Sequence, residues 1–281
     1  MKKTVTYALL FALACAAGII IGLNQKKEVT LTFVQTSDTH SCIEPDSKTG
    51  LGGYIRRATL IDSLRQHVDK DLLLFDCGDY SQGSLYYTLF HGETEVRLMN
   101  AMGYNAATIG NHEFDCGEEN MQSLFALASF PILCANYDVK GTCLEGCVKP
   151  YTVFTKKGVR IGVFGVAPPL EGLVFKKNYE GITYLDPIST ANETARKLRE
   201  KERCDIVICL SHLGWQMPDI DIDDERFIAG TRDIDIVMGG HSHSVFLEPA
   251  LYNNADGKPV PLMHNGKNAL YVGLWQVKVR K

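Results

Sequence analysis

The sequence predicts an α/β fold with a largely parallel central sheet. Short apolar runs, of the length typical of buried strands, alternate along the chain with longer stretches that repeat apolar residues at helical spacing. Such alternation indicates helices that connect parallel strands. With 281 residues, 45% hydrophobic and 22% charged, the chain has the composition of a globular protein with enough apolar residues for a core. Its sequence contains no linker, repeat or low-complexity segment that would mark a domain boundary.

Three patterns define the first elements. Val29–Thr36 alternates apolar and polar residues, which predicts a half-buried strand. Leu72–Phe75 is a short continuous apolar run, as expected of a strand that is buried on both faces. Between these two strands, Gly53–Val68 is predicted to form a helix. Its apolar residues fall on one helical face, at Ile55, Ala58, Ile61, Leu64 and Val68.

The same alternation continues to the C-terminus. Further strands are predicted at Ala106–Ile109, Ile132–Ala135, Val159–Val166, Ile206–Leu210 and Ile234–Met238. Helices are predicted at Glu93–Met102, Glu118–Ala128 and Thr190–Glu202. The final segment, Leu270–Val279, alternates apolar and polar residues again, and we expect it to be an edge strand.

The N-terminus has the features of a targeting segment. Lys2 and Lys3 precede an apolar stretch, Tyr7–Leu23, which is just long enough to span a bilayer, since a spanning helix needs ~17–25 residues. Besides a buried N-terminal helix, which would need neither the Lys pair nor the charge-free run, three alternatives stay open for residues 1–25: a cleaved signal peptide, an uncleaved membrane anchor, or a lipoprotein signal with Cys15 lipidated. All three predict an exported protein in the periplasm or cell envelope that contacts the membrane only through this segment.

Charge and cysteine content narrow the expectations further. The formal net charge of −4 argues against a nucleic acid polymer as partner, because proteins that bind DNA or RNA usually carry more basic than acidic residues. An exported protein can form disulfides, and Cys143 and Cys147 lie in a predicted loop where one could form. Most other cysteines lie in apolar runs, where a thiol usually acts as a small buried hydrophobe.

Five blocks of polar residues each follow a predicted strand. They are Asp38-Thr39-His40, Gly78-Asp79, Gly110-Asn111-His112-Glu113-Phe114-Asp115, Ser211-His212 and Gly239-Gly240-His241-Ser242-His243. Ligand sites in open α/β sheets lie beyond the carboxyl ends of the strands. We therefore expect these blocks to meet in one site, which takes five of the eight histidines of the chain.

The residue types in these blocks suit a two-metal phosphoesterase. Two divalent ions ~3.5–4 Å apart neutralise phosphoryl oxygens and lower the pKa of a bridging water. Asp79 is the natural candidate for a carboxylate that bridges both ions, and Asp38 and His40 can bind one ion from a single turn. Asn111 supplies a neutral oxygen beside the phosphate. This mixture of imidazole and carboxylate favours Mn, Zn or Fe over calcium.

These motifs resemble those of calcineurin-like metallophosphoesterases, and specifically the catalytic domain of 5′-nucleotidases. The resemblance runs from about Val29 to Val279. It implies a four-layer αββα fold of two packed mixed sheets flanked by helices, with residues 26–281 as the catalytic domain. Beyond the metal ligands, the motifs that carry it are Leu51-Gly52-Gly53, Arg56-Arg57-Ala58-Thr59-Leu60, Gly78-Asp79-Tyr80-Ser81-Gln82-Gly83 and Met102-Gly103-Tyr104-Asn105-Ala106.

The resemblance also implies a role for each polar residue. One metal would take Asp38, His40, Asp79 and His243, and the other would take Asp79, Asn111, His212 and His241. His112 and Asp115 would form a catalytic dyad in which the imidazole stabilises charge on the phosphoryl group or leaving oxygen. An alternative role for Asp115 is a helix N-cap. The expected reaction is hydrolysis of a phosphomonoester, such as a 5′-nucleotide, by a metal-bridging hydroxide.

Several hypotheses stay open for the substrate and for partners. Many 5′-nucleotidases carry a second domain that grips the nucleoside, whereas this sequence ends at Lys281, so we expect that part to come from a separate chain. Trp215 is a candidate for the docking surface, and a buried core position is the alternative. A phosphodiesterase acting on cyclic nucleotides or UDP-sugars and a non-enzymatic binding protein are the other hypotheses. Asp115 favours 5′-nucleotidases, because the cyclic-phosphodiesterase relatives tend to have Asn there.

Overall fold

The computed structural model describes residues 28–218 and 221–280. The predicted targeting segment, residues 1–25, lies outside this range. The chain divides into two compact units. The smaller unit includes Glu28–Leu31 and 276–280. In it, the carboxylate of Glu28 lies 3.2 Å from Nε of Arg280 and 3.7 Å from Nζ of Lys278. In the part of the chain that is described, no helix has the length and hydropathy needed to cross a bilayer.

The strands form two six-stranded sheets, and most of their residues belong to the larger unit, Thr32–Trp275. In the first sheet, five neighbouring strands run parallel and β14 (Gly273–Arg280) takes the edge next to β1. The parallel strands, in spatial order, are β1 (Glu28–Thr36), β2 (Leu73–Asp76), β3 (Ala106–Thr108), β4 (Ile132–Leu133) and β6 (Val148–Lys149). Its outer face packs against α2 (Tyr54–His67), α4 (Glu93–Met102) and α5 (Glu118–Leu127).

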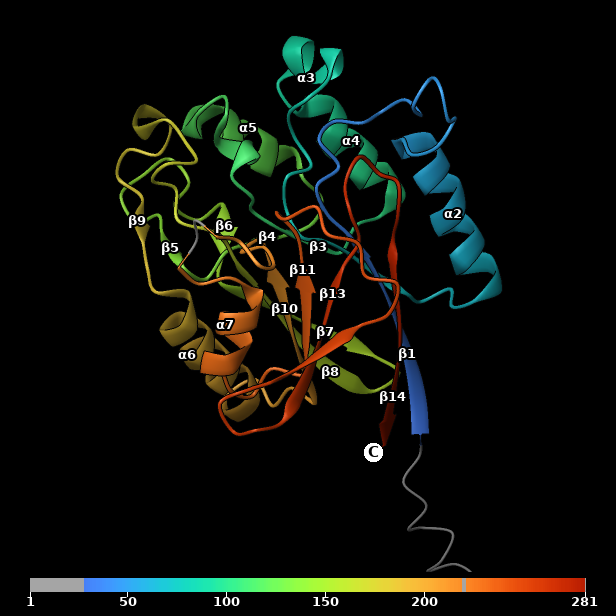
Figure 1. Cartoon of the computed structure of the whole chain (residues 1–281), viewed down its shortest axis with the longest axis vertical. Coiled ribbons are helices and arrows are strands. Elements are labelled where there is room, and N and C mark those ends of the chain that lie inside the picture. Colours follow the sequence, from blue (N-terminus) through green and yellow to red (C-terminus); the bar gives the residue numbers. More distant parts are fainter. Residues whose placement is uncertain (1–27, 219–220, 281) are drawn as a thin grey trace, which may run out of the picture. The chain divides into compact units, whose positions relative to one another are not determined.

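The second sheet has a parallel centre and antiparallel edges. Its strands, in spatial order, are β12 (Ala250–Asn253), β13 (Pro259–His264), β11 (Ile236–Gly239), β10 (Ile206–Ser211), β8 (Val159–Val166) and β7 (Tyr151–Lys156). Two helices, α6 (Pro187–Glu200) and α7 (Asp224–Gly230), pack on its outer face. Figure 1 shows these helices on the side away from α4 and α5.

The two sheets pack face to face because their strands are apolar on both faces. In β2, Leu74 packs into the outer core under the helices, while the ring of Phe75 packs against that of Phe154 of the other sheet, with their centroids 5.9 Å apart. The sheets approach closely at Gly165 of β8, where an added methyl group would overlap the carbonyl oxygen of Leu133 in β4. The architecture is therefore a four-layer αββα sandwich, which confirms the predicted fold.

Every predicted strand and helix is present, with its ends shifted by three residues at most. The sequence does not predict β7, β12, β13 and α7, nor the shorter elements α3 (Leu85–Phe90), β5 (Tyr137–Asp138), β6 and β9 (Thr183–Tyr184). β13 was hidden by Pro259 and Pro261, which are turn and edge signals. α7 has only seven residues, too few for a helical period to stand out.

One predicted face of a helix is wrong in part. Ile55 and Val68 of the expected apolar face of α2 are 60% and 44% exposed, whereas Tyr54, Arg57 and Ile61 are buried. The physical reason is a polar contact: Nη1 of Arg57 donates to Oγ1 of Thr39 at 2.6 Å. The helix therefore turns a cationic side chain inward, toward the loop that carries Asp38 and His40.

Candidate active site

Side chains from the carboxyl ends of five strands, belonging to both sheets, converge on one place. Nε2 of His40 lies 2.9 Å from Nε2 of His243, and Nε2 of His212 lies 2.9 Å from Oδ2 of Asp79. Nε2 of His243 is 3.7 Å from Oδ1 of Asp38. The strands that end here are β1, β2 and β3 of the first sheet and β10 and β11 of the second.

Backbone hydrogen bonds and the two buried carboxylates, Asp38 and Asp79, join the loops of this site to one another. The N–H of Asp38 donates to the carbonyl of Gly78 at 2.9 Å, and the N–H of His40 donates to the carbonyl of Asp79 at 3.0 Å. The side chain of Asp38 contacts a third loop, because its Oδ1 accepts from the N–H of His241 at 2.9 Å. Oδ1 of Asp79 accepts from the N–H of His112 at 2.9 Å. Each carboxylate therefore fixes a loop that comes from another strand.

Five of the candidate ligands have a left-handed backbone conformation. Asp38, His40, Asp79, His241 and His243 have φ angles of 48°, 47°, 56°, 72° and 56°. Positive φ is uncommon outside glycine and costs of order 1–3 kcal/mol per residue, so it persists where the surroundings enforce it. Five strained residues in one cluster indicate a site selected for side-chain placement rather than for stability.

Burial and neighbouring charges set the ionisation of the site. Burial raises the pKa of Asp38 to about 7. Burial alone would raise the pKa of Asp79 as well, but the charge and hydrogen bond of His212, together with the charges of His112 and His40, outweigh burial and lower that pKa below its ordinary value. Burial would lower the pKa of His212, yet Asp79 raises it to about 10. Burial lowers the pKa of His241 to about 3 and that of His243 to about 4, which keeps both imidazoles neutral.

The side chains present fit divalent metal ions. Three groups bring their ligand atoms within 4.8 Å of one another: Asp38, His40 and His243; His40, Asp79 and His112; and Asp79, His212 and His241. Within the described residues, Nδ1 of His40, Oδ1 of Asn111 and Nε2 of His241 are buried without a hydrogen-bond partner, and Nε2 of His212 has only its ion pair with Asp79. Buried polar atoms are normally paired, so a cluster of unpaired lone-pair donors beside two carboxylates matches the chemistry of a cation site.

His112 and Asp115 lie side by side at the edge of this cluster. Nδ1 of His112 is 3.0 Å from Oδ2 of Asp115, and both side chains are about one-third exposed. Burial lowers the pKa of His112, but the hydrogen bond to Asp115 and the negative charges of Asp79, Asp115 and Glu113 together outweigh burial, so the net pKa is raised. The alternative role of Asp115 as a helix N-cap is wrong, because α5 begins after Gly117 and has no side-chain cap.

Glu113 is a site residue that the sequence reading passed over. Its side chain is buried, and Oε2 accepts from the N–H groups of Asp79 at 3.0 Å and Gly110 at 2.7 Å. Oε1 accepts from the N–H of Ser81 at 3.2 Å. Glu113 thus ties the Asp79 loop to the Asn111 loop. Its place inside the Gly110–Asp115 block was the available signal.

Two other expectations have a different outcome. All described cysteines are free thiols, so the disulfide considered for Cys143 and Cys147 is absent. Trp215 is half-buried: Nε1 donates to the hydroxyl of Tyr252 at 2.8 Å, and its ring packs 4.9 Å from that of Phe246. Trp215 therefore packs at the edge of the core of the second sheet.

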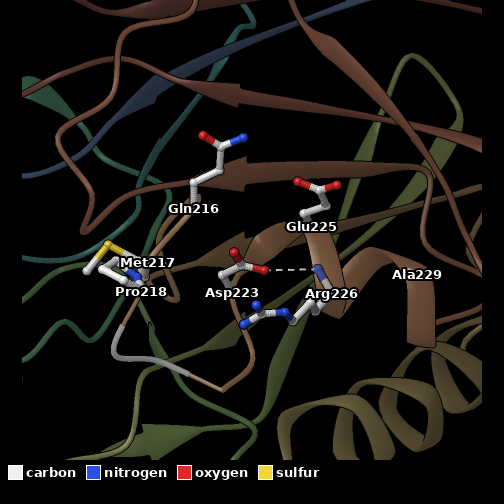
Figure 2. Close-up of a pocket in the computed structure, with 7 residues that line it drawn as sticks. All are labelled: Gln216, Met217, Pro218, Asp223, Glu225, Arg226 and Ala229. Atoms are coloured by element: carbon white, nitrogen blue, oxygen red, sulfur yellow. Dashed lines mark hydrogen bonds between the residues drawn. The ribbon is translucent and has the colours of Figure 1, made fainter.

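A pocket of about 480 Å³ opens beside the segment that follows Trp215 (Figure 2). Gln216, Met217 and Pro218 line one side of it, and residues of α7 and its N-cap line the other. The Asp223 carboxylate there accepts from the N–H of Arg226 at 3.0 Å, which is an ordinary helix cap. Because no candidate metal ligand lines this pocket, it is separate from the site built by the five blocks.

Comparison with known proteins decides the family. Residues 31–245 match the family model of calcineurin-like phosphoesterases. The chain belongs to this family. It is 29% identical to a snake venom 5′-nucleotidase of Gloydius brevicauda over 88% of this chain and 45% of that protein. The chain spans about half the length of the curated 5′-nucleotidases that it matches.

Solved structures agree with this assignment. A 5′-nucleotidase precursor from Thermus thermophilus superposes with a TM-score of 0.80 at 29% identity, covering 89% of this chain and 51% of that one. An NAD nucleotidase from Haemophilus influenzae has a TM-score of 0.79 at 28% identity, covering 90% of this chain and 48% of the other. The expected resemblance to 5′-nucleotidases is confirmed, and the family is one of metal-dependent phosphoester hydrolases.

The contacts of Glu113 predict the effect of replacing it. Glu113→Gln exchanges one acceptor oxygen for an NH2 group that faces backbone N–H donors. An unpaired buried donor costs ~1–3 kcal/mol, so we expect the free energy of unfolding in urea to fall by about that amount. Glu119→Gln, on the exposed face of α5, is the matched control and should change stability little. Equal stability of both variants would contradict the role given to Glu113.

Proposed function

We propose that this protein is an exported phosphoester hydrolase of the 5′-nucleotidase type that works with two divalent metal ions. The observation that carries the proposal is the position of Asp79. Its buried carboxylate belongs to two groups of closely spaced ligand atoms, one with His40 and His112 and one with His212 and His241. A carboxylate shared in this way is suited to hold two cations at once.

The proposed ligand sets follow the expectations from the sequence. Asp38, His40, Asp79 and His243 would hold one ion, and Asp79, Asn111, His212 and His241 would hold the other. Bound divalent ions neutralise the phosphoryl oxygens and lower the pKa of a water molecule between them. Neutral imidazoles at His241 and His243, whose pKa values burial lowers, keep their lone pairs available to a cation. The donor set favours Mn, Zn or Fe.

The protein's own acid–base group is His112. Because the Asp115 carboxylate accepts a hydrogen bond from Nδ1, it fixes the tautomer and orientation of the ring. The raised pKa of His112 favours the protonated form, in which Nε2 also carries a proton. We propose that Nε2 donates to the phosphoryl group or to the leaving oxygen of the substrate.

The proposed substrate is a 5′-nucleotide. The similarity to proteins described as 5′-nucleotidases supports it, and so does the presence of Asp rather than Asn at position 115. A second candidate is a phosphodiester or dinucleotide, which the similarity to a protein described as an NAD nucleotidase supports. The N-terminal pattern of Lys2, Lys3 and the apolar stretch Tyr7–Leu23 supports export.

A hydrolysis screen tests the function directly. The purified chain would be assayed with Mn²⁺, Zn²⁺ or Mg²⁺ against 5′-nucleotides, cyclic nucleotides, UDP-sugars, NAD, sugar phosphates and an aryl phosphate. The proposal predicts metal-dependent release of phosphate from monoesters. Metal-independent turnover, or cleavage of diesters alone, would contradict it.

The bridging role of Asp79 predicts a pattern of metal loss. Asp79→Asn removes the anion that both ions share, so both sites should weaken. His243→Ala should weaken chiefly the site with Asp38, and Asn111→Ala chiefly the site with His212. Elemental analysis of the three purified variants measures this. If Asp79→Asn retains two metals per chain, Asp79 is not the bridge.

The role of His112 predicts a leaving-group effect. His112→Ala should leave metal content nearly intact and lower turnover, with ~10²–10⁴-fold typical for loss of an acid–base group. The loss should be smaller for an aryl phosphate, whose leaving group needs less protonation. His91→Ala removes another exposed histidine and serves as the control. Equal losses on aryl and alkyl phosphates would exclude leaving-group protonation and leave phosphoryl stabilisation as the role.

The separate-chain hypothesis predicts the specificity of the 281-residue chain by itself. Contacts with remote parts of a substrate help to position its reacting atoms. If another chain supplies the nucleoside contacts, this chain alone should hydrolyse an aryl phosphate but discriminate poorly among nucleotides. The measurement is kcat/KM for AMP and for an aryl phosphate, with and without any co-purifying protein. High specificity for AMP from the chain alone would rule out the separate-chain hypothesis.

A further inference from the structure

A buried pair of ionisable side chains lies next to two of the site's loops. His264, the last residue of β13, and Asp224, the first residue of α7, are 1% and 0% exposed. Nε2 of His264 lies 2.8 Å from Oδ2 of Asp224. Because an ionised carboxylate only accepts hydrogen bonds, Nε2 carries the proton in this contact. Neither residue belongs to the five sequence blocks.

The carboxylate of Asp224 also contacts Ser211, the residue before His212. The hydroxyl of Ser211 donates to Oδ1 of Asp224 and accepts from the N–H of Leu213 at 3.2 Å. This hydroxyl therefore joins the residues on both sides of His212. It fixes the turn that places the His212 imidazole 2.9 Å from Asp79.

The His264 end of the pair reaches the loop that carries the last two histidines. Oγ of Ser242, between His241 and His243, lies 3.4 Å from Nδ1 of His264 and 3.1 Å from Oγ of Ser244. The loop starts at Gly239, which is in register with His264 across β11 and β13. A methyl group at Gly239 would overlap Nε2 of His264 and lie 2.7 Å from Oδ2 of Asp224. The pair thus packs against the start of this loop and reaches its middle.

We propose that Asp224 and His264 are positioning residues that set the metal affinity of the site, an inference that rests on the proposed metal centre. The second sheet contributes His212, His241 and His243, and all three come from the two loops that the pair joins. Among the described residues, the pair makes no hydrogen bond to a candidate ligand. Its action therefore passes through the hydroxyls of Ser211 and Ser242.

Stability alone does not account for such a pair. Apolar residues of similar volume stabilise a core as well as a buried ion pair does, and often better. A pair that spans α7 and β13 and contacts Ser211 and Ser242 can instead hold both ligand loops in place, one step further out than a partner bonded to the ligand itself. Loss of such partners lowers metal affinity by roughly 10- to 100-fold.

The test is the affinity of the full, metal-free chain for Zn²⁺, measured by competition with a chromophoric chelator, beside a thermal melt of each variant. His264→Ala removes both contacts, and His264→Gln retains an amide that can donate to Asp224. Leu262→Ala is the matched control, because Leu262 is fully buried two residues earlier on the same face of β13. We expect His264→Ala to weaken Zn²⁺ binding by roughly 10- to 100-fold, His264→Gln by less, and Leu262→Ala not at all.

The outcomes separate this inference from the proposed function. Wild-type affinity in folded His264→Ala overturns the positioning role, and so does an equal loss in Leu262→Ala at a similar melting temperature. A wild-type chain that binds no Zn²⁺, Mn²⁺ or Fe²⁺ overturns the proposed metal centre itself. Ser242→Ala leaves the buried pair in place and removes only its contact with the loop of His241 and His243. This variant tests the positioning role if His264→Ala does not fold. Weaker Zn²⁺ binding in Ser242→Ala supports the inference, and unchanged binding overturns it.

Discussion

The carboxylates of Asp38 and Asp79 are both buried where the strand ends of the two sheets meet. Moving two anions out of water into one place is costly unless donors or cations surround them. The surrounding structure supplies donors: the N–H of His241 for Asp38, and the N–H of His112 and the imidazole of His212 for Asp79. These contacts join loops from both sheets, so the site exists only when the sheets are packed together.

The strained backbone of the site follows from the same constraint. Each strand runs into the site and its chain must turn sharply to leave it, and the turns place non-glycine residues at positive φ. The rest of the fold holds them there. Glu113 binds three backbone N–H groups in two loops. Gln35 donates to the carbonyls of Gly239 and Met263 across the interface between the sheets, at 3.0 Å and 2.9 Å. The side chains of Glu113 and Gln35 thus hold the loops in place by binding backbone groups, and the loops in turn position the imidazoles.

Much of this arrangement was accessible from the sequence, for a physical reason. A parallel strand that is buried on both faces leaves a continuous apolar run, and the residues after it lie at the carboxyl edge of the sheet. Asp79 after Leu72–Phe75, and His212 after Ile206–Leu210, could therefore be placed without coordinates. Short elements interrupted by prolines, such as β13, carry no such run and were missed.

The supporting residues could not be predicted, because folding alone brings them together. Asp224 and His264 are 40 residues apart in the sequence and lie in different elements. The inward turn of Arg57 likewise depends on Thr39, which belongs to another loop. Hydrophobic periodicity favoured Ile55 for the buried face of α2. Periodicity counts apolar residues only, so it contains no information about a polar contact such as the one between Arg57 and Thr39.

The central claim is that Asp79 lies between two cations. Crystals of the protein grown with Mn²⁺, measured with X-rays near the manganese absorption edge, test it most directly. We predict two anomalous peaks within about 4 Å of each other, one beside His243 and one beside His241, with the Asp79 carboxylate contacting both. A single peak, or two peaks of which only one contacts Asp79, would contradict the account.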